Sequence, residues 1–202
     1  MNLLFVRHGK DSDQHRGGWS QLDLLPEGKR EAKTLADYLV QHKEDYHFTK
    51  MITSDLKRAE TTATILAETL QLPLEKESSL RETNNGDLAG MLNSEADQKF
   101  PRLYFRSLAM DEHYPNGESP REFYQRIKTW FQRFLQENNN SDETQIVVTH
   151  GGVINIIYHL VNQIEWTNKS NLFHVKHCSI SLLNTKTLVF EVENQTDFLE
   201  EK

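Results

Sequence analysis

The stretch that decides the fold is Leu3-Leu4-Phe5-Val6-Arg7-His8-Gly9, an apolar run that stops at an arginine, a histidine and a glycine. It predicts a buried strand with a charged group at its carboxyl end. The pattern recurs far along the chain, where Gln145-Ile146-Val147-Val148-Thr149 leads into His150-Gly151-Gly152 and a helical stretch beginning at Val153. Two buried strands that each end in His-Gly indicate one shared site.

Helical and strand patterns alternate through the rest of the chain. After Pro26, which suits the first position of a helix, Ala32, Leu35, Ala36 and Leu39 follow helical spacing. Further along the chain we expect a strand at 50–53, a helix capped by Ser54 or Asp55 that runs to Leu70, and a weak strand at 74–76. A helical pattern over 94–110 is interrupted by Pro101. The next helix begins with a Ser119–Glu122 capping box and is built on Phe123, Ile127, Trp130 and Phe134, and the last two strands, at 178–183 and 187–192, form a hairpin.

This alternation predicts an α/β fold, a three-layer α/β/α sandwich on a mostly parallel sheet with an antiparallel hairpin at one edge. The length suits one domain over residues 1–202. In such folds, ligands bind beyond the carboxyl ends of the strands. Arg7-His8, the turn from Ser54 to Arg58, and His150 all fall there, so we expect them to share one site.

Composition narrows the functional classes. No apolar run approaches the roughly 20 residues that span a bilayer, so we expect a cytoplasmic protein with no membrane partner. The net charge of −7 disfavours nucleic acid as a partner, because phosphate backbones are held by basic surfaces. The single cysteine, Cys178, cannot form an internal disulfide and is expected to be a buried structural residue in a reducing compartment.

The residues at the strand ends predict an anion site. The guanidiniums of Arg7 and Arg58 offer forked donors that match phosphate oxygens, and the Gly151-Gly152 helix start offers free backbone N–H groups. His8 and His150 lack the close ligand pairing of a zinc signature, and neighbouring arginines repel a dication. We therefore expect a phosphate cradle with no metal and no cofactor.

At this point the chain resembles a known family. Val6-Arg7-His8-Gly9 resembles the signature of the histidine phosphatases, the phosphoglycerate-mutase-like superfamily. Further segments resemble this family's motifs in the same order, namely Gly18-Trp19 to Leu24 with Pro26-Glu27-Gly28, Ser54 to Ala63, Leu80-Arg81-Glu82 with Gly86 and Gly90, Gly117-Glu118-Ser119, and Val148 to Gly152. The resemblance runs from Leu3 to about Ile157 and implies a phosphoglycerate-mutase-like fold.

The resemblance also implies a mechanism. His8 would attack phosphorus and form a phosphohistidine, which divides one difficult displacement into two easier ones. Arg7, Arg58 and His150 would hold the phosphate oxygens and stabilise charge in the transition state. Glu82 would protonate the departing alkoxide and then take a proton from water. Without the resemblance, Glu82 would be interpreted as a solvated loop acid.

The chain departs from the family's pattern in three places. Lys10-Asp11 stands where the family commonly has Glu or Gln and then Ser or Thr. Gln14 stands at the position of a phosphate-binding Asn, and because its amide offers the same donors on a longer arm, we expect Gln14 to contact phosphate. Leu25-Pro26 replaces the usual Leu-Thr, which removes a side-chain cap but not the helix.

Three functions stay open. The first is a metal-independent phosphomonoesterase acting on a small phosphorylated metabolite, favoured because the connection from Glu82 to Gly117 is short, whereas the mutases that the chain resembles carry a longer insertion that encloses the intermediate. The second is a phosphoglycerate-type mutase. The third is a non-catalytic phospho-ligand binding module, since a fold alone does not establish activity.

Less can be said of the substrate side. Residues from about 88 to 116 are expected to cover the substrate, whose identity stays open, as does the oligomeric state, a homodimer included. Two roles, pocket wall or packing, stay open for Trp19, Arg81, Phe105 and Tyr114. The other histidines match no motif and are expected to be surface or packing residues: His15, His42, His47, His113, His159, His174 and His177.

Overall fold

A central sheet organises the molecule in the computed structural model, which describes residues 1–138, 143–170 and 172–200. Its strands are β1 (Asn2–Arg7), β2 (Phe48–Thr53), β3 (Leu74–Lys76), β4 (Thr144–Thr149), β5 (Ile180–Asn184) and β6 (Val189–Gln195), arranged in the order β3-β2-β4-β1-β5-β6. The first four in that order are parallel, and β5 and β6 add an antiparallel hairpin at one edge. The predicted mixed α/β sheet is confirmed.

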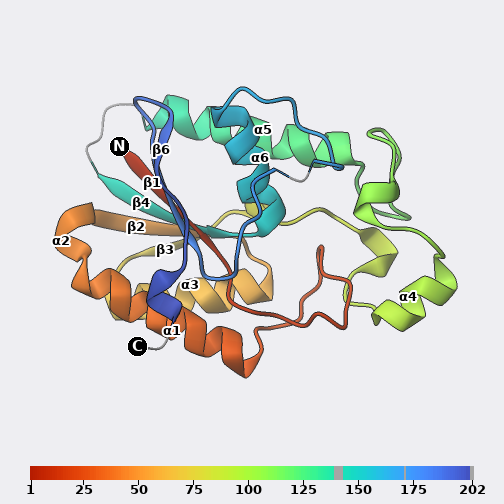
Figure 1. Ribbon diagram of the computed structural model, residues 1–202, viewed down its shortest axis with the longest axis horizontal. Coiled ribbons are helices and arrows are strands. Elements are labelled where there is room, and N and C mark those ends of the chain that lie inside the picture. The colour runs from red at the N-terminus through yellow and green to blue at the C-terminus, as the bar shows by residue number, and fades with distance from the viewer. Residues whose placement is uncertain (139–142, 171, 201–202) are drawn as a thin grey trace.

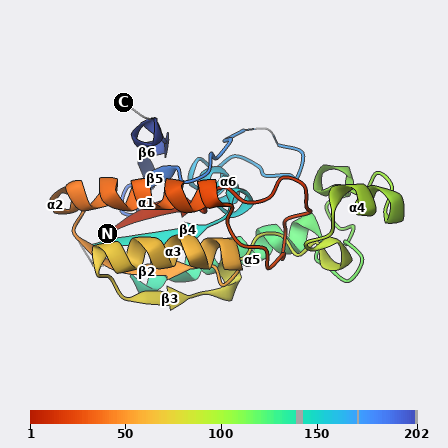
Figure 2. The same ribbon diagram turned by 90° about the horizontal axis from the view of Figure 1, so that it is seen from below.

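Helices cover both faces of this sheet (Figure 1). They are α1 (Pro26–Gln41), α2 (Lys43–Tyr46), α3 (Lys57–Leu70), α4 (Asn93–Lys99), α5 (Pro120–Glu137) and α6 (Gly151–Val161). α1 and α3 pack on one face, and α5 and α6 pack on the other; Figure 2 shows the first pair in front of the strands. In both views α4 lies beyond one end of the sheet. Within the described ranges, no helix combines the length and apolarity needed to cross a bilayer.

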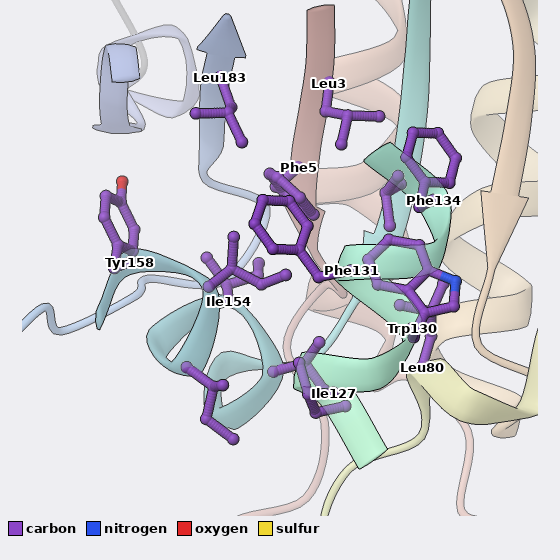
Figure 3. Close-up of a cluster of buried hydrophobic side chains, with 14 of the residues drawn as sticks. Leu3, Phe5, Leu80, Ile127, Trp130, Phe131, Phe134, Ile154, Tyr158 and Leu183 are labelled. Atoms are coloured by element: carbon purple, nitrogen blue, oxygen red, sulfur yellow. The ribbon is translucent and has the colours of Figure 1, made fainter. Parts of the chain in front are cut away.

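The alternating side chains of β1 connect the two halves of the core. Leu3 and Phe5 point to the layer of α5 and α6, and Leu4 and Val6 point to the layer of α1 and α3. All four are fully buried, which contributes roughly 1.5–3 kcal/mol per side chain. Figure 3 shows Phe5 among the buried side chains on the α5 and α6 face of the sheet, which include Ile154 of α6. The apolar run that precedes His8 is therefore held rigidly from both sides.

Two local expectations were wrong. The helical pattern over 94–110 gives only α4, because Pro101 has no N–H to donate and disfavours helical backbone at Phe100; Phe105–Ser107 forms a separate 3₁₀ turn. Ser54 and Asp55 do not cap α3, whose N-cap residue is Leu56 with no side-chain hydrogen bond. Ser54 has a different partner, described below.

Two other expectations about helix starts were confirmed. The Ser119 hydroxyl accepts a hydrogen bond from the Glu122 N–H, and the Glu122 carboxylate accepts one from the Ser119 N–H. At α1, Leu25 is the N-cap without a side-chain bond, and Pro26 still begins the helix. The sequence signals were reliable where the chemistry of the cap is local.

The strand order gathers the predicted residues at one edge. β1 and β2 lie on either side of β4, and all three are parallel, so their carboxyl ends meet. The backbone N–H of His8 donates to the Thr149 carbonyl at 2.9 Å, and that of Ser54 donates to the Val148 carbonyl at 3.0 Å. His8, Ser54 and His150 therefore leave three adjacent strands at the same level.

Candidate active site

His8 is buried, with 4% of its surface exposed, and its ring has a defined orientation. Nδ1 lies 2.8 Å from the carbonyl oxygen of Gly9, which can only accept, so Nδ1 carries the proton. Nε2 is then the ring atom with a free electron pair. Burial, followed by the positive charge of Arg58, holds the pKa of His8 well below its usual range. The ring is therefore neutral and presents a nucleophilic nitrogen.

Arg58 lies directly beside that nitrogen. Its Nε donates to His8 Nε2 at 3.3 Å, and its other two nitrogens donate to the carbonyls of Ser20, at 3.1 Å, and Gly18, at 2.8 Å. The polar loop after β1 thus holds the guanidinium through its backbone. Only 2% of Arg58 is exposed, so its charge acts in a poorly hydrated setting, where electrostatic attraction to an anion is strong.

His150 lies on the other side of His8, with the two ring centroids 5.1 Å apart. Its Nε2 is 2.8 Å from the Ser54 hydroxyl, which also accepts from the Leu56 N–H at 3.3 Å. Among the described residues, Nε2 is the acceptor within reach of the hydroxyl's own proton, and this donation favours the His150 tautomer with the proton on Nδ1. Burial, and then the charges of Arg58 and Arg7, keep the pKa of His150 well below its usual range.

Two donor atoms in this site are buried and have no partner. They are Nδ1 of His150 and Nε of Arg7, and they are among five such side-chain atoms in the described ranges. Buried polar atoms in folded proteins nearly always have partners, so their concentration at one place needs an explanation. A phosphate oxygen would accept from both kinds of donor.

Glu82 reaches the site from the loop after the 3₁₀ turn Ser78–Leu80. One carboxylate oxygen accepts from the Gly152 N–H at 3.0 Å, at the start of α6, and the other accepts from the Thr83 N–H at 3.1 Å. A side chain on Gly152 would place its Cβ 2.3 Å from Glu82 Oε1, so this approach requires glycine. The backbone carbonyl of Glu82 is also held, by Trp19 Nε1 at 2.8 Å and Arg126 Nη2 at 3.1 Å.

The residues that depart from the family's pattern, Lys10, Asp11 and Gln14, lie in different places in the structure. Lys10 turns away to pair with Glu27 of α1 at 2.8 Å, whereas Asp11 turns into the site and pairs with Arg58 at 3.5 Å. Burial would raise the pKa of Asp11, but a hydrogen bond from His177 in its protonated form and the positive charge of Arg58 outweigh burial and lower this pKa to about 2. Gln14 is exposed, and in the described part of the chain its amide has no hydrogen bond to the other site residues. The role of Gln14 stays a prediction.

His177 was expected to be a surface or packing residue, and the structure places it inside the site instead. Its Nε2 lies 2.7 Å from Arg7 Nη2, and its ring centroid lies 5.6 Å from that of His8. It belongs to the loop before β5, far from every recognised motif. The sequence carries no signal for it, because the pairing of β5 with β1, which brings residues just before β5 to the end of β1, is seen only in the fold.

A metal ion would meet obstacles here. The side chains of His8, Asp11 and His177 bring ligand atoms within 4.8 Å of one another. However, His8 Nε2 already accepts from Arg58, His177 Nε2 already contacts Arg7, and the Asp11 carboxylate already pairs with Arg58. A cation would have to displace two guanidiniums, whereas an anion would be attracted by them.

A cavity of about 340 Å³ adjoins Arg7 and Glu82 and continues past Gly151 at the start of α6. This volume is in the range of small-molecule sites. Aromatic walls come from Phe105, Phe123, Trp166 and Phe173, and exposed Arg106 and His174 also line it.

Only Phe105, of the four residues considered for the substrate side, lines this cavity. Trp19 and Arg81 stack on each other, with the guanidinium 4.6 Å from the ring, and Tyr114 packs in a small core with Leu88 and Leu108. The wall formed by residues within 166–170 and 172–175 was not predicted from the sequence, because these residues carry no motif. Whether the segment 88–116 covers a substrate stays a prediction.

Cys178 is buried and free, as expected. Burial raises the pKa of its thiol far above the usual range, so it is not a nucleophile at neutral pH. Its backbone N–H donates to the Arg7 carbonyl at 3.0 Å, which ties the loop of His177 to the end of β1.

Comparison with known proteins agrees with this geometry. The model of the histidine phosphatase superfamily (branch 1) matches residues 3–197. The chain is 30% identical over 180 residues to a 2,3-bisphosphoglycerate-dependent phosphoglycerate mutase of Cytophaga hutchinsonii, covering 86% of this chain and 81% of that protein. It is 31% identical over 156 residues to phosphoserine phosphatase 1 of Hydrogenobacter thermophilus, covering 74% and 71%.

The fold has close counterparts among solved structures. Bacillus stearothermophilus YhfR superposes with a TM-score of 0.83 at 22% identity, covering 98% of this chain and 99% of that one. At that identity the likeness shows the shared fold alone. The family match, which spans nearly the whole chain and includes both strand ends with His-Gly, shows more: this protein belongs to the histidine phosphatase superfamily, whose members are phosphatases and phosphoglycerate mutases.

Proposed function

We propose that this protein is a metal-independent phosphomonoesterase that hydrolyses a small phosphate ester through a phosphohistidine on His8. The observation that carries the proposal is the state of His8: Nδ1 is committed to the Gly9 carbonyl, and the unprotonated Nε2 accepts a hydrogen bond from the Nε of Arg58 at 3.3 Å. A neutral imidazole beside a guanidinium is suited to attack a phosphorus atom whose oxygens the guanidinium holds.

In the first step, His8 Nε2 forms a bond to phosphorus as the ester P–O bond breaks. The departing oxygen takes the proton of Glu82, which lines the cavity next to Arg7. In the second step, the Glu82 carboxylate removes a proton from water, the resulting hydroxide attacks phosphorus, and the P–N bond breaks. Inorganic phosphate leaves, and His8 and Glu82 return to their starting protonation states.

Four donors serve the phosphoryl group in both steps. Arg58 and Arg7 supply fixed positive charge, and His150 supplies its Nδ1 proton. The backbone N–H of Gly151, at the first turn of α6, adds the positive end of a helix dipole. These groups are held by other contacts before a ligand arrives, so little reorganisation opposes the reaction.

The cavity supports hydrolysis of a small metabolite ester. It is large enough for the alcohol part of such a substrate, and its lining includes exposed residues, so water can enter the cavity beside Arg7 and Glu82. The similarity to a phosphoglycerate mutase keeps transfer to a second alcohol as the alternative. A mutase would return the phosphoryl group to the substrate faster than water captures it.

The test uses purified protein treated with a chelator and given an aryl phosphate. We expect turnover without added metal, loss of turnover in His8→Ala, and an acid-labile phosphoryl group on His8 detected by mass spectrometry after rapid quenching. His47→Asn is the matched control, because His47 is exposed, precedes β2 at the opposite end of the sheet, and has left-handed backbone that Asn tolerates. Metal-dependent turnover, or turnover that survives in His8→Ala, would refute the proposal.

Hydrolase and mutase are separated with a phosphorylated sugar acid as substrate. Release of inorganic phosphate should exceed movement of phosphate between hydroxyl positions, both measured by phosphorus NMR. The opposite ratio would identify a mutase. Binding of inorganic phosphate with no turnover of any ester would identify a phospho-ligand binding module.

A further inference from the structure

Arg7 is held by two contacts from one loop. Its Nη1 donates to the Val175 carbonyl at 2.5 Å, and its Nη2 lies 2.7 Å from Nε2 of His177. A guanidinium has donors only and stays protonated, so Nε2 of His177 must be the acceptor. In this arrangement the His177 ring is neutral and carries its proton on Nδ1.

The backbone keeps His177 in register with Arg7. The Cys178 N–H donates to the Arg7 carbonyl at 3.0 Å, and the Arg7 N–H donates to the Ser179 carbonyl at 3.3 Å. β5, which begins at Ile180, then pairs with β1. The imidazole therefore approaches Arg7 from a position that the sheet itself defines.

Asp11 lies on another side of the same nitrogen. Its carboxylate is 3.6 Å from His177 Nε2 and also pairs with Arg58. Nε2 cannot accept from Arg7 and donate to Asp11 at the same time. The neutral ring satisfies Arg7, and a protonated ring would repel Arg7 and donate to Asp11.

We propose that neutral His177 is a positioning residue that holds the Arg7 guanidinium toward the phosphate. His177 then contributes to the affinity for phosphate although it takes no part in bond making. The kinetic readouts of this inference rest on the proposed phosphatase function, whereas its binding readouts do not.

Two charged side chains lie beside Nε2 of His177. The guanidinium of Arg7 is 2.7 Å away and the carboxylate of Asp11 is 3.6 Å away, so the closer contact is the one to Arg7. The side chain of His177 is 31% exposed. The other titratable or charged groups around it are His8 at the end of β1, Lys10 in the following loop, Glu27 and Glu31 on α1, Lys176 beside it, and Glu200 near the C-terminus.

Two substitutions separate positioning from simple packing. His177→Gln keeps a neutral acceptor at a similar reach but cannot titrate, and His177→Leu keeps bulk without an acceptor. At pH 7.5 we expect His177→Leu to weaken the inhibition constant of inorganic phosphate about tenfold and to raise KM more than it lowers kcat, as when a charge-assisted hydrogen bond is lost. His177→Gln should remain within about twofold of the unmodified protein, on the same reasoning.

The control is His113→Gln, since His113 is exposed and pairs with Glu122, and its inhibition constant for phosphate should match that of the unmodified protein. Equal damage in His177→Gln and His177→Leu, or an unchanged inhibition constant in His177→Leu, would overturn the proposal.

A measurement without substitution keeps the inference testable if a variant does not fold. Nitrogen NMR of the imidazole rings should show His177 with its proton on Nδ1 at pH 7.5. A proton on Nε2 at that pH would overturn the proposal. If no ester is turned over but calorimetric phosphate binding still depends on His177, the proposed phosphatase function fails and this inference stands. If His177→Leu turns over esters and binds phosphate normally, the phosphatase function stands and this inference fails.

Discussion

The carboxylate of Glu82 accepts a hydrogen bond from the backbone N–H of Gly152 at 3.0 Å, two residues after His150. One turn of chain therefore positions both His150 and Glu82. The absence of a side chain on Gly152 makes this possible, since a Cβ there would lie 2.3 Å from a Glu82 oxygen. In the proposed mechanism, the first helical turn of α6 would both hold the acid and contact phosphate.

Gly152→Ala should displace Glu82 while leaving its charge in place. We expect kcat for an alkyl phosphate to fall about tenfold to a hundredfold, which is at or below the roughly 10²–10⁴-fold that a positioned acid contributes, because Glu82 is displaced and not removed. Turnover of an aryl phosphate should fall much less, because its leaving group needs no proton. Gly17→Ala is the control, as open space surrounds that position. Equal losses for the two substrates would show that the substitution acts elsewhere.

Glu82→Gln tests the acid directly. The amide keeps the size of the side chain and an acceptor for the Gly152 N–H, but it cannot deliver a proton. Esters with poor leaving groups should slow by about a hundredfold or more, and aryl phosphates by far less. The measurement is kcat/KM across a series of esters with graded leaving-group pKa, where a steeper dependence is expected in the variant. An unchanged slope would remove Glu82 from the acid role.

Ser54→Ala should weaken the support of His150. Without the hydroxyl, Nε2 of His150 loses its partner at 2.8 Å and the tautomer with the proton on Nδ1 is no longer favoured. We expect phosphate inhibition to weaken by about fivefold to tenfold, equivalent to one lost hydrogen bond of roughly 1 kcal/mol. Thr69→Ala, which removes a hydroxyl from the far end of α3, should leave it unchanged. A Ser54→Ala protein with normal phosphate affinity would contradict the assignment.

Acid should destabilise the fold through His8 and His150. Burial and neighbouring arginines lower the pKa of both, whereas an unfolded chain's histidine has a pKa of about 6.5. Above about pH 6.5 both states are neutral and nothing is lost; as pH falls toward the lowered pKa values, only the unfolded state takes up protons. The free energy of unfolding should then drop by up to about 1.4 kcal/mol per pH unit for each histidine.

Urea unfolding at pH 7.5, 6.5 and 5.5 measures this dependence. His150→Gln should show a shallower fall than the unmodified protein, because one of the two titrating groups is gone. His47→Asn should show the same fall as the unmodified protein, since His47 is exposed. A free energy of unfolding that stays constant down to pH 5.5 would mean that these rings are not held neutral.

Much of this protein can be predicted from its sequence, because the relevant information is local. The alternating apolar residues of β1 determine which side chains face each helical layer, and the run of strands and helices determines the parallel sheet. The carboxyl ends of parallel strands lie at the same edge of a sheet, so the sequence alone predicts that Arg7, His8, Arg58 and His150 share one site. Pro101 also predicts an interruption of the helical pattern over 94–110, although not that the α-helix fails to resume after it.

The tertiary structure decided what lies between these residues. His177 and the cavity wall within 166–170 and 172–175 carry no motif, and only the pairing of β5 with β1 brings them to Arg7. Ser54 looks like a helix cap in the sequence, yet it supports His150 because β2 and β4 are neighbours. Sequence patterns report periodicity and propensity along the chain, whereas hydrogen bonds between distant loops depend on how the sheet is ordered, and that order is a property of the whole fold.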